Sequence, residues 1–405
     1  MNTKWLTARY AVLQIAYWGA YCALSGYAAV FLTGKGFSAG QTGTLMALGN
    51  VLAALLQPVA AAAADRGKHV SLKGLMLSIG GFSTVMLLAL GLSGKQFLAI
   101  CLGFAAATVS IQVIQPLLNA MGMYFVGRGE HLNFGLARGL GSVGYAAVSY
   151  LMGVLTEVLG ENVIPLIAFF LCIPFLAVTL SFRMGGNAGS VGAGKQEPQR
   201  AESRPSPENI FLFLRRRGAF AVLLLGVICF FTFHFMTNTY MFQMIEAVGG
   251  DSQDMGLAVS LAAMTEIPVM ALFAWLVKKI RVERLLRFSA VMWIVRSVFF
   301  CLCTSVVSIY GAQLMQMITY GLYIPASVYY ADQVMDPDHK VQGQALMTMA
   351  FTVGSVFGNF LGGILIDRFS VHTMLYFGAF CTTAGTLCFF AGTRRKTIDE
   401  QETVC

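Results

Sequence analysis

Glu266 and Arg296 are charged residues near the middle of consecutive hydrophobic stretches, each long enough to cross a bilayer. A charge at the bilayer centre costs roughly 2.5–3.5 kcal/mol on insertion scales, and such residues commonly mark ion pathways or binding sites. Burial favours the neutral form of a carboxyl group, whereas a nearby guanidinium favours its charged form, so this pair could take up and release a proton. The alternative is a structural ion pair, which contributes little stability because desolvation offsets the attraction.

Basic residues at the ends of the two stretches set the depth of these charges. Glu266 lies twelve residues before Lys278, and Arg296 lies twelve residues after Arg284. Because a helix rises 1.5 Å per residue, both charges should lie about 18 Å from the membrane face that the basic residues mark. We therefore expect Glu266 and Arg296 at one level on neighbouring antiparallel helices, an arrangement that suggests a transport site.

The composition is that of a membrane protein. Of the 405 residues, 57% are hydrophobic and only 11% are charged, whereas a soluble chain carries about 25% charged residues. The first hydrophobic stretch is too long for the core of a signal peptide and lacks a small-residue cleavage site, so no cleaved signal is expected. Eight of the nine cysteines fall inside hydrophobic stretches and indicate packing residues. Cys301-x-Cys303 has the wrong spacing for a zinc site.

Twelve hydrophobic stretches predict an all-α integral membrane protein with twelve transmembrane helices. They cover residues 7–32, 41–64, 71–93, 97–122, 134–157, 163–182, 219–245, 254–277, 285–304, 307–331, 342–366 and 372–392. An even number places both termini on one side, and that side collects most of the 27 Lys and Arg residues. By the positive-inside rule we expect a multi-pass protein of the cytoplasmic (inner) membrane with both termini cytoplasmic. The net charge of +8 is then a topology signal.

A hydrophilic segment divides the twelve stretches six and six. Residues 184–217 are rich in Gly, Ser, Pro, Arg and Glu, which indicates a flexible cytoplasmic linker. We predict an N-terminal six-helix bundle at 1–183, a C-terminal six-helix bundle at 218–393 and a cytoplasmic tail at 394–405.

The two halves share short sequence patterns. Gly141-Ser142-Val143 in the fifth stretch recurs as Gly354-Ser355-Val356 in the eleventh. Gln57-Pro58 in the second stretch has a counterpart in Ile267-Pro268 in the eighth. Two pseudo-symmetric six-helix bundles with a site near the midplane are typical of secondary transporters.

Polar residues in the first half mark predicted helix faces. Arg138 lies a few turns into the stretch 134–157. It either binds a carboxylate or vicinal hydroxyls, or extends to the cytoplasmic surface. Gln112, Gln115 and Asn119 follow helical spacing in the stretch 97–122, and a polar stripe in a membrane helix should face a cavity. We assign Arg138, Gln115 and Asn119 to substrate binding.

Two further polar faces lie in the second half. His234 and Asn238 share one face of the stretch 219–245, and Gln316 and Tyr320 belong to a polar and aromatic stripe in 307–331. We assign Asn238, Gln316 and Tyr320 to substrate binding. His234 either makes a hydrogen bond between helices or acts as a second proton acceptor, since imidazole titrates near neutral pH.

Several motifs resemble the major facilitator superfamily of secondary transporters. Asp65-Arg66-Gly67-Lys68 resembles the signature turn between its second and third spans, with Ala61 where the family usually has glycine. Phe134-Gly135-Leu136-Ala137-Arg138, with Gly141 to Tyr145, resembles the fifth span of lactose permease and related proton symporters. Glu266-Ile267-Pro268 and Val295-Arg296 resemble the eighth and ninth spans of that group and of phenylpropionate-type permeases.

The resemblance implies roles for particular side chains. Asp65, Arg66 and Lys68 would form a cytoplasmic charge network that holds one gate conformation. Arg138 would contact the substrate, and Tyr145 would stack on a sugar ring.

It also implies where a proton would bind. Glu266 would hydrogen-bond the substrate, and Arg296 would tune the proton site. The His and Glu of the tenth span of lactose permease fall on Gln316 and Thr319. Proton coupling is therefore assigned to Glu266 and Arg296, with His234 as a further candidate.

We predict a proton-coupled symporter of a small polar solute, a sugar or glycoside, that works by alternating access. The alternatives are a proton-coupled permease for an organic anion such as an aromatic carboxylate, and a transporter-like receptor without flux. The chain has no HExxH, G-x-S-x-G or Walker motif, so we expect no enzymatic activity. We expect no cofactor, metal or nucleic acid, and a functional monomer whose partners are the solute, the proton and the lipid bilayer.

Overall fold

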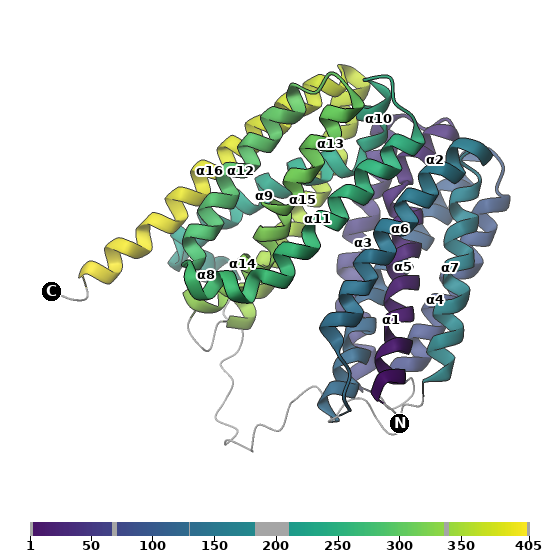
Figure 1. Cartoon of the computed structure of the whole chain (residues 1–405), viewed down its shortest axis with the longest axis horizontal. Helices are drawn as coiled ribbons and strands as arrows, with labels where there is room; N and C mark the ends of the chain where they lie inside the picture. The colour runs from purple at the N-terminus through teal and green to yellow at the C-terminus, as the bar shows by residue number, and fades with distance from the viewer. Residues whose placement is uncertain (1–2, 67–70, 129, 183–209, 336–339, 403–405) are drawn as a thin grey trace. The chain divides into compact units, whose positions relative to one another are not determined.

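The structure is a computed structural model that describes residues 3–66, 71–128, 130–182, 210–335 and 340–402, and the regular elements in these ranges are all helices (Figure 1). The chain divides into two compact units, residues 1–199 with 251–264 and residues 200–250 with 265–405. Most of the predicted linker lies outside the described residues, but its end, Ile210–Arg216, forms the short helix α8. The bundle limits predicted at 183 and 218 stay a prediction.

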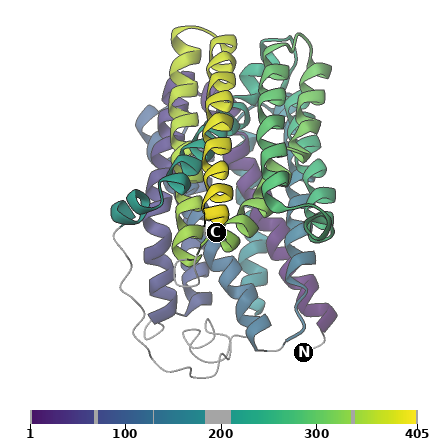
Figure 2. The same cartoon turned by 90° about the vertical axis from the view of Figure 1, so that its left-hand side faces the viewer.

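Except for the short helix at Ala28–Gly34, the helices of the first unit are long, and they lie side by side (Figures 1 and 2). They are α1 (Thr3–Tyr21), a π-helical turn (Cys22–Gly26), α2 (Ala28–Gly34), α3 (Ala39–Arg66), α4 (Leu72–Leu92), α5 (Phe97–Gly127), α6 (Phe134–Leu159) and α7 (Val163–Ser181), with the start of α11.

The second unit repeats this plan with one further interruption. Its helices are α8, α9 (Gly218–Thr239), α10 (Met241–Glu246), the rest of α11 (Ser252–Lys279), α12 (Val282–Cys301), α13 (Val306–Leu314), a 3-10 turn (Met315–Met317), α14 (Tyr320–Val334), α15 (Lys340–Arg368) and α16 (Val371–Glu402).

Most of the predicted spans are present as uninterrupted apolar helices. Within the described ranges, nine helices are long and apolar enough to cross a membrane, and α1 with α2 makes a tenth span bent by 43°. The remaining two predicted spans are α12, which carries four charged residues, and the interrupted helix from α13 to α14. The twelve-helix prediction therefore corresponds to the described helices, with breaks in the first, seventh and tenth spans that the hydrophobic pattern did not predict.

The two units share one packing scheme. In the first, α1 packs against α6 and α7, while α4 packs against α5 and α7. In the second, the corresponding α9 packs against α15 and α16, while α12 packs against α14 and α16. These matched pairs confirm the pseudo-symmetry that the repeated sequence patterns indicate.

Glycines bring the first helix of each unit close to its neighbour. A Cβ at Gly141 would lie 2.7 Å from Trp18 Cδ1 on α1, and one at Gly354 would lie 2.8 Å from the Ile228 carbonyl oxygen on α9. Gly358 is tighter, because a Cβ there would lie 2.5 Å from the Thr232 carbonyl oxygen. The recurring Gly-Ser-Val motif therefore marks the helix pair in each unit where small residues let two backbones approach.

A tyrosine fixes each of these helix pairs near the point where the first helix is interrupted. Tyr27 donates to the Ser149 carbonyl oxygen at 2.6 Å, and Tyr240 donates to the Asn359 carbonyl oxygen at 2.6 Å. Both tyrosines are fully buried. Tyr27 and Tyr240 have the same separation in sequence as Gly141 and Gly354, so this device belongs to the repeat.

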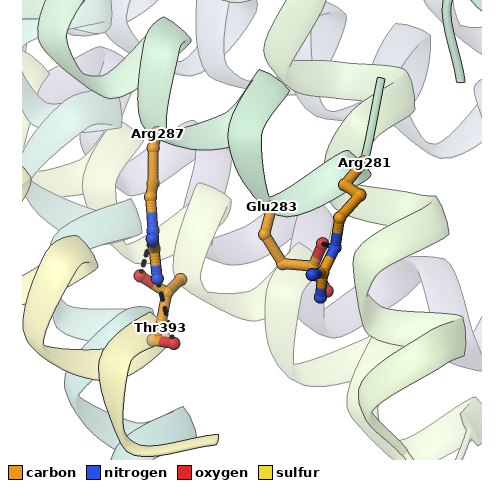
Figure 3. Close-up of polar contacts among 4 residues, drawn as sticks. All are labelled: Arg281, Glu283, Arg287 and Thr393. Carbon is orange, nitrogen blue, oxygen red and sulfur yellow. Dashed lines mark hydrogen bonds and ion pairs between the residues drawn. The ribbon is translucent and has the colours of Figure 1, made fainter. Parts of the chain in front are cut away.

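Basic side chains bond to the last helix of each unit, at the end of α7 and within α16. Lys73 donates to the carbonyl oxygens of Leu180 and Phe182 at 2.7 and 2.8 Å. In the second unit, Arg287 of α12 donates to the hydroxyl and carbonyl oxygens of Thr393 at 3.0 and 3.2 Å (Figure 3). At the end of α7 the cation satisfies free carbonyls and complements the helix dipole. Thr393 instead lies inside α16, nine residues before its last residue, Glu402, so Arg287 joins α12 to the side of α16.

Replacing Gly358 with valine should destabilise the protein, because the new side chain must displace the backbone of α9. Overpacking of this kind costs typically about 1–3 kcal/mol. The free energy of unfolding, measured by denaturant titration in detergent micelles, reports the loss. Gly81→Val is the matched control, since a Cβ at Gly81 meets nothing within 4 Å. Equal effects of the two substitutions would contradict a close contact at Gly358.

Candidate functional site

Arg296 is the centre of the polar cluster in the second unit. Its side chain is 1% exposed. The guanidinium donates three hydrogen bonds, to the Ala312 carbonyl at 3.1 Å, the Thr319 hydroxyl at 3.2 Å and the Gln313 amide oxygen at 2.7 Å. All three acceptors are neutral, and all belong to the tenth span.

The interruption of the tenth span supplies these acceptors. Helix α13 ends at Leu314, and Thr319, which precedes α14, has φ −96° and ψ −94°, outside the helical region. A helix end leaves its last four carbonyls without helical donors, and Ala312 lies in that last turn. Thr319 also lies at the break, and its carbonyl accepts from Ser289 of α12 at 3.0 Å. The span predicted at 307–331 is therefore present but interrupted, and Arg296 and Ser289 of α12 bond with groups at the break.

Glu266 of α11 faces the same break. Its carboxylate accepts a hydrogen bond of 2.9 Å from the Gln316 amide, and its charge acts on Arg296. Both charged residues thus face the break, but the hydrogen bonds of Arg296 go to neutral groups, and the placement of the two charges at one level on neighbouring helices stays a prediction. The carboxylate is half-buried, whereas the Gln316 side chain is 4% exposed.

His234 and Asn238 share one face of α9, as their spacing predicted, and the structure adds Tyr320 of α14 to them. The His234 and Tyr320 rings stack with centroids 4.5 Å apart and planes 7° from parallel. The Asn238 amide donates to the His234 carbonyl at 3.0 Å and lies 2.9 Å from its ring Nε2. His234 is therefore held between α9 and α14 by stacking as well as by hydrogen bonds.

Trp293 is a residue of this cluster that the sequence reasoning missed. It is fully buried and stacks on Phe230, and its ring lies 5.8 Å from that of His234. Its indole N–H has no hydrogen-bond partner among the described residues, nor has the Gln316 amide oxygen. Trp293 precedes Arg296 by three residues, a spacing that places both on one face of α12. This spacing could have identified Trp293 from the sequence.

Arg138 is the corresponding cation of the first unit, and an aromatic ring holds it. Its guanidinium carbon lies 4.2 Å from the centroid of Trp18, and Nη1 donates to the Ser142 hydroxyl at 3.2 Å. The Trp18 N–H in turn donates to Gln14, whose amide donates to the Tyr10 hydroxyl. Since Arg138 is half-buried and braced by this chain, it is positioned within the unit rather than extended along its surface.

Tyr145 lies against the π-helical turn of the first span. A Cβ at Gly26 would lie 3.3 Å from its hydroxyl, so glycine leaves room for the tyrosine. The structure places Tyr145 on the same helix as Arg138, two turns further along.

The polar stripe of α5 divides into two parts. Gln112 donates to Asn50 at 3.1 Å and its carbonyl accepts from Gln57, so it joins α5 to α3. Gln115 and Asn119 are half-buried and make no hydrogen bond with a described residue. The assignment of these two amides to substrate binding stays a prediction.

The predicted gate residues cannot be placed in the same detail. Asp65 and Arg66 are the last residues of α3, but their side chains and the whole of Lys68 lie outside the described part of the structure. No group of three or more His, Cys, Asp or Glu residues that could hold a metal occurs among the described residues.

A model of the family described as "MFS_1 like family" matches residues 7–377. The maltose permease of Geobacillus stearothermophilus is 25% identical over 401 residues, which cover 97% of each chain. The uncharacterized transporter YwbF of Bacillus subtilis (strain 168) is 25% identical over 348 residues, 84% of this chain and 82% of the relative.

Solved transporter structures have the same fold. The nucleoside transporter NupG superposes with a TM-score of 0.79 at 14% identity, over 97% of this chain and 99% of that one. A bacterial homolog of the lysosomal transporter Spinster, in an inward-facing and unoccupied conformation, gives 0.70 at 14% identity, over 96% and 97%.

Replacing Arg296 with lysine should destabilise the protein although the charge is kept, because an ammonium group cannot reach the three acceptors that the planar guanidinium spans. Each buried acceptor left without a donor costs about 1–3 kcal/mol. Unfolding in detergent micelles measures the loss. Arg284→Lys, at an exposed site on the same helix, is the control and should change stability by less than about 0.5 kcal/mol. A wild-type stability for Arg296→Lys would show that the three bonds are dispensable.

Proposed function

The chain belongs to the MFS_1 like family of the major facilitator superfamily and is a multi-pass membrane transporter rather than an enzyme, and on that premise we propose that it is a proton-coupled symporter of a sugar or glycoside. It works by alternating access, needs no cofactor besides the proton gradient, and acts as a monomer in the cytoplasmic membrane with both termini cytoplasmic.

The contact between Glu266 and Gln316 is the observation that carries the proton coupling. Glu266 is bound by the neutral Gln316 amide and can gain a proton. Arg296 would stay hydrogen-bonded when this happens, because it has three neutral acceptors of its own. The positive charge of Arg296 then favours release of the proton from Glu266 whenever the two approach. Because the tenth span fixes Arg296, a change in their separation comes from α11, the helix that carries Glu266.

The sugar assignment rests on the maltose permease relative and on the groups available in the first unit. Gln115 and Asn119 offer amides to hydroxyl groups, and Tyr145 offers an aromatic ring to the apolar face of a sugar. Arg138 can donate two parallel hydrogen bonds to vicinal hydroxyls.

An organic anion is the second candidate, and the braced guanidinium of Arg138 favours it. Bidentate pairing with a carboxylate is the strongest contact that an arginine fork makes. Saturable binding without flux in liposomes would instead indicate a transporter-like receptor and contradict both proposals.

Replacing Glu266 with glutamine should abolish uphill accumulation driven by a proton gradient, because the amide cannot titrate, while downhill exchange continues. Proteoliposomes loaded at two pH values and supplied with radiolabelled maltose measure both processes. Glu246→Gln, at an exposed position after α9, is the control and should leave both unchanged. Proton-driven accumulation at the wild-type level in Glu266→Gln would overturn the coupling role.

Replacing Arg138 with lysine separates the two substrate classes. Lysine keeps the charge but loses the two-pronged contact, so transport of a bound carboxylate should fall roughly 10- to 100-fold, whereas hydroxyl contacts made by Gln115 and Asn119 remain. Counterflow of maltose and of phenylpropionate is compared in the same vesicles, with Arg128→Lys as the control on an exposed helix end. If the wild type transports phenylpropionate but not maltose, and Arg138→Lys loses phenylpropionate counterflow, the sugar proposal is overturned in favour of the anion.

A further inference from the structure

Five basic residues and one acid lie where α11 ends and α12 begins. The basic residues are Lys278, Lys279, Arg281, Arg284 and Arg287, and the acid is Glu283. By the topology prediction this junction lies on the cytoplasmic face, where a positive excess is expected. The structure shows what each of these cations does.

Basic residues at comparable helix ends are occupied within the protein. Lys73 and Arg9 bond to carbonyl oxygens at the end of α7, and Arg287 bonds to Thr393. Arg217 contacts Phe213 and Met335. Such residues hold the helices of one unit together and have little left to offer a ligand.

The other four cations of the junction are directed outward. Lys278 and Arg284 are exposed and make no hydrogen bond or ion pair with any residue that the structure describes. The Arg281 side chain is 70% exposed, and its Nε lies 3.6 Å from Glu283, a surface pair that contributes little (Figure 3).

Apolar side chains lie beside these cations. Trp275 is 52% exposed, and the Lys279 ammonium lies 4.2 Å from its ring centroid. Phe288, one turn into α12 from Arg284, is 47% exposed. An exposed tryptophan next to cations is typical of the headgroup level of a bilayer, where its apolar ring and polar edge are both satisfied.

We propose that Trp275, Lys278, Lys279, Arg281, Arg284 and Phe288 form a binding surface for an anionic phospholipid. The phosphate and headgroup bind the four cations, while Trp275 and Phe288 contact the upper acyl chains. Basic residues that serve only to set the topology need no exposed aromatic neighbours and need not point away from the protein. Exposed cations beside exposed aromatic side chains therefore point to a lipid. The inference does not depend on which solute the protein carries.

The surface has a consequence for the two charged helices. Glu266 lies thirteen residues before Lys279 on α11, and Arg296 lies twelve residues after Arg284 on α12. A headgroup bound at both helix ends holds these ends at one level, and with them the depth of the two charges, about 18–20 Å away along each helix.

The test measures binding of phosphatidylglycerol and of phosphatidylcholine with identical acyl chains to the full-length protein, by native mass spectrometry from a neutral detergent. Wild type should bind phosphatidylglycerol more tightly. The double variant Lys279→Gln/Arg284→Gln should bind it roughly 30-fold more weakly, from about a fivefold contribution per basic residue near the surface. Trp275→Leu, which keeps every charge, should weaken both lipids.

The matched control is Arg215→Gln/Arg216→Gln, which removes the same charge from exposed positions at the end of α8. It should keep wild-type affinity. Equal weakening by both double variants would show that only net charge matters. Equal affinity of the wild type for the two lipids would show that the headgroup is not recognised. Either result overturns the proposal. Residues 397–405 can also be deleted, alone and together with Lys279→Gln/Arg284→Gln. If the deletion raises phosphatidylglycerol binding, and the double variant does not lower the raised affinity, the surface is assigned to the acidic C-terminal tail instead of a lipid.

Discussion

A buried guanidinium needs acceptors for its donors, and the arrangement of the second unit follows from how Arg296 obtains them. Water is absent from a bilayer core, so the acceptors must come from other helices. The tenth span provides them by breaking between Leu314 and Tyr320, which directs one carbonyl, one hydroxyl and one amide oxygen toward α12. The break in turn brings Gln316 to Glu266 and Tyr320 to His234, so one buried charge organises contacts on four helices.

The two units share their supports and differ in their charges. Close glycine contacts, a buried tyrosine bonded to a neighbouring carbonyl, and a basic side chain bonded to the last helix occur in both. The polar centres diverge, because Arg138 is half-buried and held over Trp18, whereas Arg296 is enclosed by neutral acceptors. The supporting contacts are therefore repeated in the two units, whereas the polar centres at Arg138 and Arg296 differ.

Exposed cations at the junction of α11 and α12 complete this division of roles. Arg287 bonds to Thr393 of α16, while the cations that precede it, Lys278, Lys279, Arg281 and Arg284, are exposed. The same short segment therefore contributes to the fold through one residue and presents a surface through the others. Sequence alone cannot separate these roles, because both kinds of residue satisfy the positive-inside rule equally.

The amino-acid sequence by itself determined the membrane class, the number of spans, the repeated halves and the residues worth examining. Each of these depends on local properties: the length of an apolar run, the spacing of polar residues on one helix, and the distribution of charge between runs. The break in the tenth span, the neutral partners of Arg296, the role of Gln112 in joining α3 and α5, and the burial of Trp293 were decided only by the tertiary structure. Their physical reason is non-local, because a helix is interrupted, or a polar group is satisfied, by donors and acceptors on other helices that the spacing along one helix does not specify.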